Sequence, residues 1–97
     1  LFPDKEIFIT ENGIATDDDD ERIEFVSDVL KDIHQYLDSN SKVIGYLYWS
    51  LLDNFEWDLG YQMNFGLVEV DKSTYERKPH NSAKWFGEIS STNIFSY

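Results

Sequence analysis

IFITENGIA, residues 7–15, is an apolar and β-branched run that breaks on Glu-Asn-Gly. Asn-Gly is typical of a tight hairpin turn, but a hairpin needs a second strand directly after the turn. Here the turn leads instead into a polar segment with four aspartates at residues 17–20, which cannot pair as a core strand. The sequence therefore predicts a strand over residues 6–10 that ends at the carboxylate of Glu11 and opens into an acidic loop.

Beyond this loop, the spacing of apolar residues predicts a helix over residues 21–37. The apolar positions recur every three or four residues, which is typical of a single buried stripe: Ile23, Val26, Leu30, Ile33 and Leu37. A second apolar strand, VIGYLYW, is predicted over residues 43–49. Strand, helix and strand in this order form one βαβ unit, so the two strands should be parallel with a right-handed crossover.

The remaining chain predicts less regular structure. Residues 53–66 are irregular and aromatic, residues 65–70 suggest a short extended segment, and residues 82–89 suggest a final helix. Parallel strands need cover on both faces, and each of the two predicted strands would leave an unpaired edge. We therefore expect this α/β segment to be incomplete on its own.

Composition excludes several classes of partner. The formal net charge is −11, whereas nucleic-acid binding needs clustered Lys and Arg to displace counterions. The same charge disfavours binding to anionic membranes, and no apolar run is long enough to span a bilayer. The chain has no cysteine, which fits a reducing compartment, and we expect a cytoplasmic location. Neither nucleic acid nor membrane is expected as a partner.

The unusual residues are predicted to meet at one edge of the sheet. In parallel α/β sheets, ligands bind at the carboxyl ends of the strands. Glu11 comes after the first strand, and WSLLDNFEW at residues 49–57 comes after the second. This run adds four candidate residues: Trp49, Asp53, Glu56 and Trp57. Carboxylates accept hydrogen bonds from hydroxyls, and an indole face packs on the apolar face of a pyranose, so the pattern favours a sugar ligand.

A second interpretation of the same residues stays open at this point. The tryptophans could form an aromatic core seam, with Asp53 and Glu56 solvated or capping backbone groups. This interpretation requires Trp49 and Trp57 to be fully buried, with no cleft beside Glu11.

Metal and cofactor sites are not expected. A calcium loop starting at Asp17 would need glycine at its sixth position and glutamate at its twelfth, where this chain has Arg22 and Asp28. We therefore interpret the aspartates as a solvated loop and helix N-terminus. His34 and His80 have no metal-ligand spacing.

Three motifs in order carry a resemblance to a known family: ITENGIA, YLYWSLLDNFEWDLGYQMNFGLVEVD and ERKP. Together they resemble the C-terminal segment of glycoside hydrolase family one, the retaining β-glucosidases and β-galactosidases built on a (β/α)8 TIM barrel. The sequence of these motifs most resembles that of archaeal-type members. The resemblance implies that residues 1–97 are a single fragment of the catalytic domain. Residues 5–37 would be its seventh βα unit and residues 43–89 its eighth.

The resemblance also implies roles for individual residues. Glu11 matches the catalytic nucleophile that forms the glycosyl-enzyme, and Trp49 matches the platform beneath the sugar. Glu56 matches the carboxylate that accepts the sugar's 4- and 6-hydroxyls, and Trp57 the indole that donates to the 3-hydroxyl. Phe65 matches an aromatic wall of the same subsite. The expected substrate is a β-glycoside or oligosaccharide.

The resemblance implies two further features. In the family the peptide bond after the platform tryptophan is typically cis, which here is the bond between Trp49 and Ser50. Members that hydrolyse 6-phospho-sugars replace the carboxylate at Glu56, because a carboxylate repels phosphate. An unphosphorylated sugar is therefore expected.

One catalytic group is missing from this chain. Retaining hydrolysis needs a nucleophile and an acid/base carboxyl about 5–5.5 Å apart. The family supplies the acid/base from an Asn-Glu-Pro motif, which does not occur here, and Glu56 is rejected for that role. The chain alone should be nearly inert, and its expected partner is the remainder of the barrel. Two rival functions remain: a remnant that binds sugar without hydrolysis, and a non-enzymatic interaction domain with the aromatics in its core.

Overall fold

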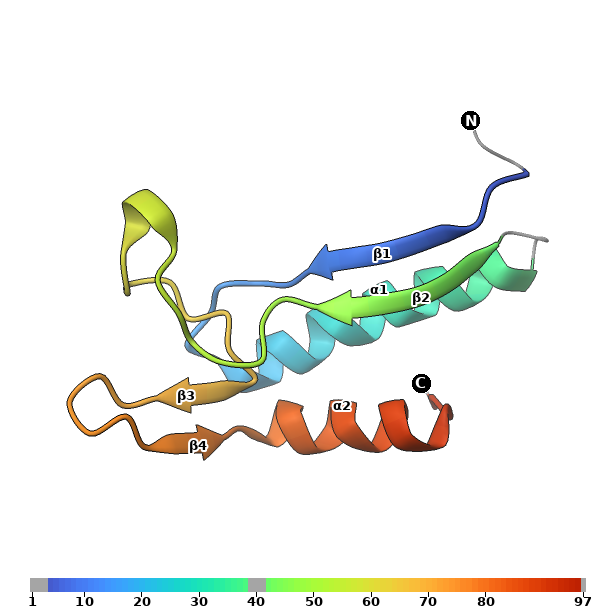
Figure 1. Ribbon diagram of the computed structural model, residues 1–97. Helices are drawn as coiled ribbons and strands as arrows, with labels where there is room; N and C mark the ends of the chain where they lie inside the picture. Colours follow the sequence, from blue (N-terminus) through green and yellow to red (C-terminus); the bar gives the residue numbers. More distant parts are fainter. Residues whose placement is uncertain (1–3, 39–41, 97) are drawn as a thin grey trace.

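A computed structural model describes residues 4–38 and 42–96 of the chain, so the ends of the predicted 1–97 unit lie outside it. The elements in chain order are β1 (Ile7–Asn12), α1 (Asp19–Asp38), β2 (Val43–Tyr48), the 3-10 turn η1 (Trp57–Leu59), β3 (Val68–Val70), β4 (Arg77–Pro79) and α2 (Asn81–Thr92). Figure 1 shows β1 and β2 side by side, with α1 between them in sequence and α2 at the C-terminal end.

The β1–β2 pair confirms the predicted βαβ unit. The strands are parallel, with Ile7 opposite Val43 and Asn12 opposite Tyr48. β1 continues two residues beyond the predicted end, because the Asn12 carbonyl accepts a hydrogen bond from the Trp49 N–H at 2.9 Å. Glu11 therefore lies within the last residues of the strand, not after it.

Helix α1 begins two residues earlier than predicted. The Asp18 carboxylate accepts hydrogen bonds from the N–H groups of Asp20 (3.0 Å) and Glu21 (3.4 Å). These N–H groups have no partner within a helix, so Asp18 acts as the N-cap. In the middle of the predicted stripe Val26 is buried, whereas Leu37 near the end of the helix is exposed. Ile23, Leu30 and Ile33 are half-buried, so the stripe loses its cover only at its last position.

The sequence did not predict the β3–β4 hairpin. β3 pairs antiparallel with β4, with Val68 opposite Pro79 and Val70 opposite Arg77. Only the last three residues of the predicted 65–70 segment form a strand. β4 was missed because Arg-Lys-Pro is polar, fully exposed and ends in proline, which is tolerated only at a sheet edge.

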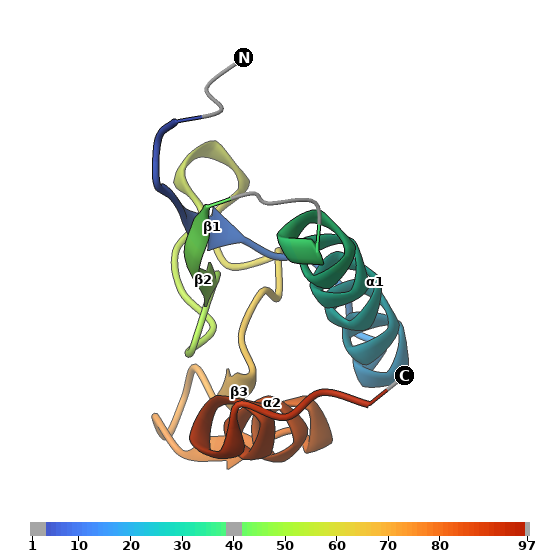
Figure 2. The same cartoon turned by 90° about the vertical axis from the view of Figure 1, so that its right-hand side faces the viewer.

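Helix α2 is longer than the predicted 82–89 and packs under β2 through one aromatic residue. The ring of Phe86 lies 6.1 Å from that of Tyr46 and 6.3 Å from that of Tyr48, centroid to centroid. The helix ends at Thr92 and is capped by Asn93, which adopts the left-handed conformation (φ 55°) and donates its N–H to the carbonyl of Ile89. Figure 2 shows α1 beside the β1–β2 pair and α2 below it.

The molecule is more open than a compact domain of this length. Its radius of gyration is 15.0 Å, against about 13 Å for a compact domain of 100 residues. Large apolar side chains on the strands, such as Phe8, Ile44 and Leu47, are exposed. This agrees with the expectation that the strand pair needs further cover. Within residues 4–38 and 42–96, no helix is long and apolar enough to cross a bilayer.

Candidate active site

The carboxyl ends of β1 and β2 lie against each other, as predicted. A side chain at Gly13 would place its Cβ 1.8 Å from the carbonyl oxygen of Trp49, so only glycine fits this close approach. Together with the hydrogen bond between Asn12 and Trp49, this contact joins the chain after Glu11 to the chain after β2. In Figure 1 both loops leave the sheet at the arrowheads of the two strands.

Phe65 is held at the same rim by backbone contacts. Its carbonyl accepts hydrogen bonds from the Tyr48 hydroxyl (2.9 Å) and from the Ser50 N–H (3.3 Å). The Ser50 carbonyl in turn accepts from the Leu67 N–H at 2.9 Å. The peptide bond between Trp49 and Ser50 is cis, as the resemblance implied. The structure thus brings Glu11, Trp49 and Phe65 to one edge of the sheet.

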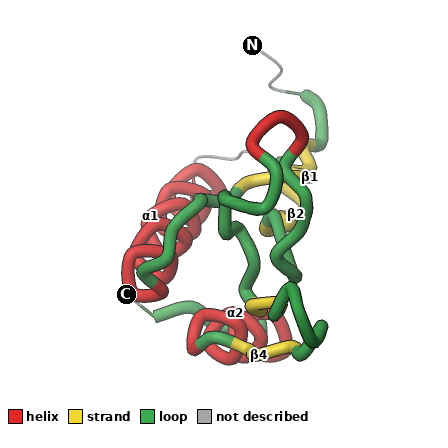
Figure 3. Tube along the Cα trace, turned by 90° about the vertical axis from the view of Figure 1, so that its left-hand side faces the viewer, coloured by secondary structure: helices red, strands yellow, loops and turns green. Residues whose placement is uncertain are grey.

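Glu56 and Trp57 lie on a turn that stands away from this rim. The Glu56 N–H donates to the carbonyl of Gly60 at 2.7 Å, and the Leu59 N–H donates to the carbonyl of Glu56 at 2.8 Å. The turn therefore closes on itself, and the Trp57 side chain is 84% exposed. Figure 3 shows η1 rising from the loops on the side of β1.

Asp53 proves to be structural. Its carboxylate accepts the Gly66 N–H at 2.8 Å, and its own N–H donates to the carbonyl of Val68 at 3.1 Å. A Cβ on Gly66 would lie 2.4 Å from the Asp53 nitrogen, so these two segments are in direct contact. Of the two open interpretations of Asp53, the structure supports capping of backbone groups.

The exposure of the tryptophans contradicts a core seam. Trp49 is 38% exposed and Trp57 far more, whereas a seam requires both to be buried. Glu11 is exposed as well. A cavity of about 440 Å³ lies between the loop after β1 and the β3–β4 hairpin, but Glu11 and Trp49 do not line it. The candidate site is therefore an open edge, not that cavity.

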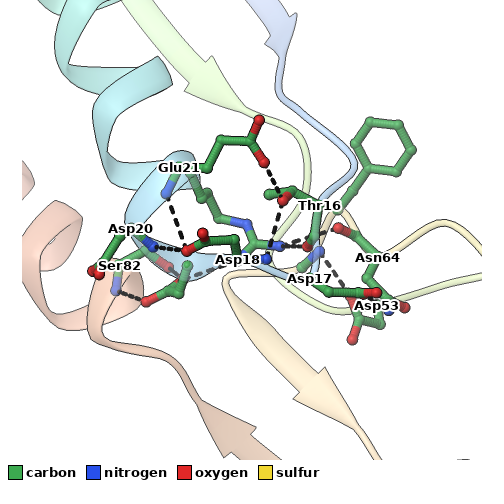
Figure 4. A network of polar contacts seen from close by, with 12 residues as sticks. Thr16, Asp17, Asp18, Asp20, Glu21, Asp53, Asn64 and Ser82 are labelled. Atoms are coloured by element: carbon green, nitrogen blue, oxygen red, sulfur yellow. Dashed lines mark hydrogen bonds and ion pairs between the residues drawn. The ribbon is translucent and has the colours of Figure 1, made fainter.

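A partly buried ion pair beside this edge was missed. Arg22 is 1% exposed and pairs with Asp19 at 2.9 Å, where the sequence suggested a solvated acidic loop. Asp19 also accepts hydrogen bonds from the Ser82 N–H (2.9 Å) and hydroxyl (2.6 Å), which ties α1 to α2. Figure 4 shows this network around Thr16, Asn64 and Ser82. The sequence contained one sign of this burial: Arg22 lies four residues before Val26, and therefore on the same face of the helix as the apolar stripe.

The surroundings shift the pKa values of three groups in this region. Burial works against ionisation of Asp19, but hydrogen bonds from Ser82 and Arg22 outweigh it and lower the pKa of the carboxyl below 3.8. Burial raises the pKa of Tyr48, and the nearby Arg22 charge opposes that rise. Burial also raises the pKa of Tyr46 to about 12. Its hydroxyl stays protonated and donates to the Asn12 side chain at 2.9 Å, next to Glu11.

Among the residues that the structure describes, no group of three or more His, Asp or Glu side chains is placed to hold a metal ion.

Known proteins are similar to this chain in sequence and in fold. Residues 2–95 match the family model described as "Glycosyl hydrolase family 1". A β-glycosidase from Pyrococcus horikoshii is 45% identical with a TM-score of 0.93, over 96% of this chain and 22% of its own. A β-glucosidase from Exiguobacterium antarcticum is 41% identical (TM-score 0.86), over 90% of this chain and 21% of its own. A family 1 β-glucosidase from Thermotoga maritima is 36% identical (TM-score 0.90), over 94% of this chain and 23% of its own.

The chain spans about a fifth of the length of these proteins, and its fold matches a portion of their structures. The archaeal Pyrococcus structure agrees with the expected likeness to archaeal-type members. Both comparisons, by sequence and by structure, confirm the resemblance that the three motifs carried. The chain belongs to glycosyl hydrolase family 1.

Proposed function

We propose that this chain supplies the seventh and eighth βα units of a (β/α)8 barrel, and with them part of the active site of a retaining β-glycosidase. The observation that carries the proposal is the position of Glu11 and Trp49 at the adjoining carboxyl ends of two parallel strands. In barrels of this type the active site lies at that face.

Glu11 is the proposed nucleophile. Its carboxylate attacks the anomeric carbon from the face opposite the leaving group, and the bond to the leaving oxygen breaks as that oxygen takes a proton from a second carboxyl group. Water then attacks the same carbon, gives its proton to the second carboxylate, and releases Glu11 with the original configuration restored in the sugar. The exposure of Glu11 supports this role, because a nucleophile must be open to its substrate.

Four aromatic and acidic residues are the proposed sugar contacts. The Trp49 face lies under the pyranose, Phe65 forms a wall beside it, and Glu56 and Trp57 bind its hydroxyls. The hydrogen bonds that hold the Phe65 backbone beside Ser50 support a common subsite for Phe65 and Trp49. The negative charge of Glu56 favours a sugar without phosphate.

The proposed partner of this chain is the remainder of the barrel. It would pair with the free edges of β1 and β2, cover exposed apolar residues such as Phe8 and Ile44, and contribute the acid/base. General acid catalysis contributes about 10²–10⁴ in rate, so the chain alone should be nearly inactive on ordinary glycosides.

A fused barrel tests the proposal. In it, the whole 97-residue chain replaces the matched segment of the Pyrococcus horikoshii β-glycosidase. A 2-fluoro-β-glycoside with a dinitrophenolate leaving group should label Glu11, because this leaving group departs without an acid and the fluorine slows release of the ester. Mass spectrometry of the digested protein should find the adduct on the peptide that contains Glu11.

The Glu11→Ala variant should stay unlabelled. An adduct on another residue would overturn the assignment of the nucleophile. Sugar binding without any adduct in the unmodified fused barrel would instead support the rival function, a remnant that binds sugar and does not hydrolyse it.

A further inference from the structure

Arg22 is a buried charge that the proposed reaction does not use. Its Nη2 donates to two backbone carbonyls, those of Thr16 at 2.6 Å and Asn64 at 3.1 Å, and its Nη1 donates to Asp19 at 2.9 Å. The two carbonyls belong to segments far apart in sequence. One guanidinium group therefore joins the loop after β1, the loop before β3 and the first turn of α1 (Figure 4).

Both loops lead directly to proposed site residues. Thr16 lies beyond the strand that carries Glu11, and Asn64 is the residue before Phe65. The Thr16 N–H also donates to the Asn64 carbonyl at 3.1 Å, so the two loops share a second hydrogen bond at the same point. These contacts hold the Asn64 carbonyl against Thr16. The next carbonyl along the chain, that of Phe65, accepts hydrogen bonds from Tyr48 and Ser50 at the end of β2, so the start of this segment is fixed as well.

The geometry at Arg22 needs a planar guanidinium. Its fork can reach two carbonyls and a carboxylate at once, whereas the ammonium of lysine is a single point charge. Hydrogen bonds from a charged donor are also about twice as strong as neutral ones. The Nε of Arg22 is buried and has no hydrogen-bond partner among the described residues. The side chain thus forgoes one hydrogen bond while it keeps the contacts that join the loops.

A buried ion pair is by itself a weak source of stability, since the cost of removing both charges from water offsets their attraction. The contacts of Arg22 point to another role. We propose that Arg22 is a positioning residue of the active site, which fixes the nucleophile loop relative to the loop that carries Phe65. This inference rests on the proposed function of Glu11 and Phe65.

Two variants in the fused barrel separate positioning from stability. Arg22→Met keeps the bulk of the side chain and removes the contacts to Thr16 and Asn64. Ser82→Ala is the matched control, because it removes a hydrogen bond to Asp19 Oδ1, the oxygen that Arg22 also contacts, and leaves the Arg22 contacts to both loops in place. A further variant, Arg22→Lys, tests whether charge alone suffices.

Amide hydrogen exchange measures directly whether Arg22 holds the two loops together. The N–H groups of Thr16 and Ser50 bond across the joined segments, so both should exchange at least about tenfold faster in Arg22→Met than in Ser82→Ala at equal thermal stability. Equal exchange in the two variants would overturn the inference. This measurement needs no turnover, so it remains decisive even if Glu11 is not labelled and the proposed function fails.

Steady-state kinetics provide the second readout. Misplacement of catalytic groups by about 1 Å can cost on the order of 100-fold in rate. Arg22→Met should therefore lower kcat by about 10- to 100-fold and raise KM, with rates expressed per active site titrated by the 2-fluoro-glycoside. Ser82→Ala should keep both constants, and Arg22→Lys should recover them only in part. A purely structural role would reduce the titrated active fraction and leave kcat and KM unchanged, which would overturn the inference.

Discussion

The Arg22 junction and the aromatic turn at residues 55–61 lie in the same set of loops but are held by opposite means. At the junction a buried guanidinium binds carbonyls from two distant segments. In the turn, the backbone N–H groups of Glu56, Leu59 and Gly60 all bond to carbonyls of the same turn, and Trp57 is exposed. The loop after Glu11 is thus fixed to a distant segment of this chain, whereas the turn is tied to the β3–β4 hairpin only at its end, where Lys72 contacts Tyr61. We expect the remainder of the proposed barrel to support the rest of the turn.

Loss of the proposed nucleophile should have the largest effect on activity. In the fused barrel, Glu11→Ala should lower turnover of an aryl β-glycoside on the order of 10⁶-fold, as removal of a catalytic nucleophile does in other hydrolases. Added azide should enter the vacated face and give the α-glycosyl azide, which NMR identifies. The control is Glu6→Ala, an exposed carboxylate before the same strand, which should keep full activity.

A change in the turn should weaken binding without loss of stability. Glu56→Gln in the fused barrel should lower kcat/KM by about 10- to 100-fold, because hydrogen bonds to a charged group contribute about 1.5–3 kcal/mol. The melting temperature should not change. Asp58→Asn, two residues along the same turn and exposed, should change neither quantity. A drop in melting temperature in Glu56→Gln would show that the turn is structural and would break the comparison.

Asp53 marks the boundary between the two regions. Asp53→Ala leaves the Gly66 N–H without its acceptor and should lower the free energy of unfolding of the fused barrel by about 1–3 kcal/mol. Urea denaturation measures this change. The kinetic constants of the protein that remains folded should be altered less than by Glu56→Gln. The opposite ranking would place Asp53 in the sugar site and Glu56 in the scaffold.

The smallest expected effect is a pH dependence at Asp19. Its folded-state pKa lies below the ordinary value of 3.8, so its contribution to stability is complete above that value and is lost as the pH falls toward the lower one. The difference in urea midpoint between the unmodified fused barrel and Asp19→Asn should therefore be constant above about pH 5 and shrink below about pH 4. A difference that grows on acidification would contradict the lowered pKa.

Sequence patterns predicted the βαβ unit because the relevant information is local. Apolar spacing located α1, continuous apolar runs located β1 and β2, and the connection length required parallel strands. These rules also placed Glu11 and Trp49 at one edge. The same rules missed β4, because a polar edge strand has no apolar pattern and is defined only by pairing with β3.

The side-chain roles divide in the same way. The family motifs carried the identity of the candidate residues, and the structure brings Glu11, Trp49 and Phe65 to one rim. Asp53 and Glu56, neighbours in one motif, look alike in sequence. Their roles differ in the structure because the Asp53 carboxylate accepts a hydrogen bond from the Gly66 N–H, beyond the aromatic turn.

Local spacing along the chain was thus enough to specify β1, β2 and the helix between them, and three motifs carried the resemblance to the family. The burial of Arg22, the tie from Asp19 to Ser82 and the structural use of Asp53 depended on folding. Each of these contacts joins residues far apart in sequence. Whether a charged side chain is solvated or buried depends on what packs against it, and a neighbouring stretch of sequence does not contain that information.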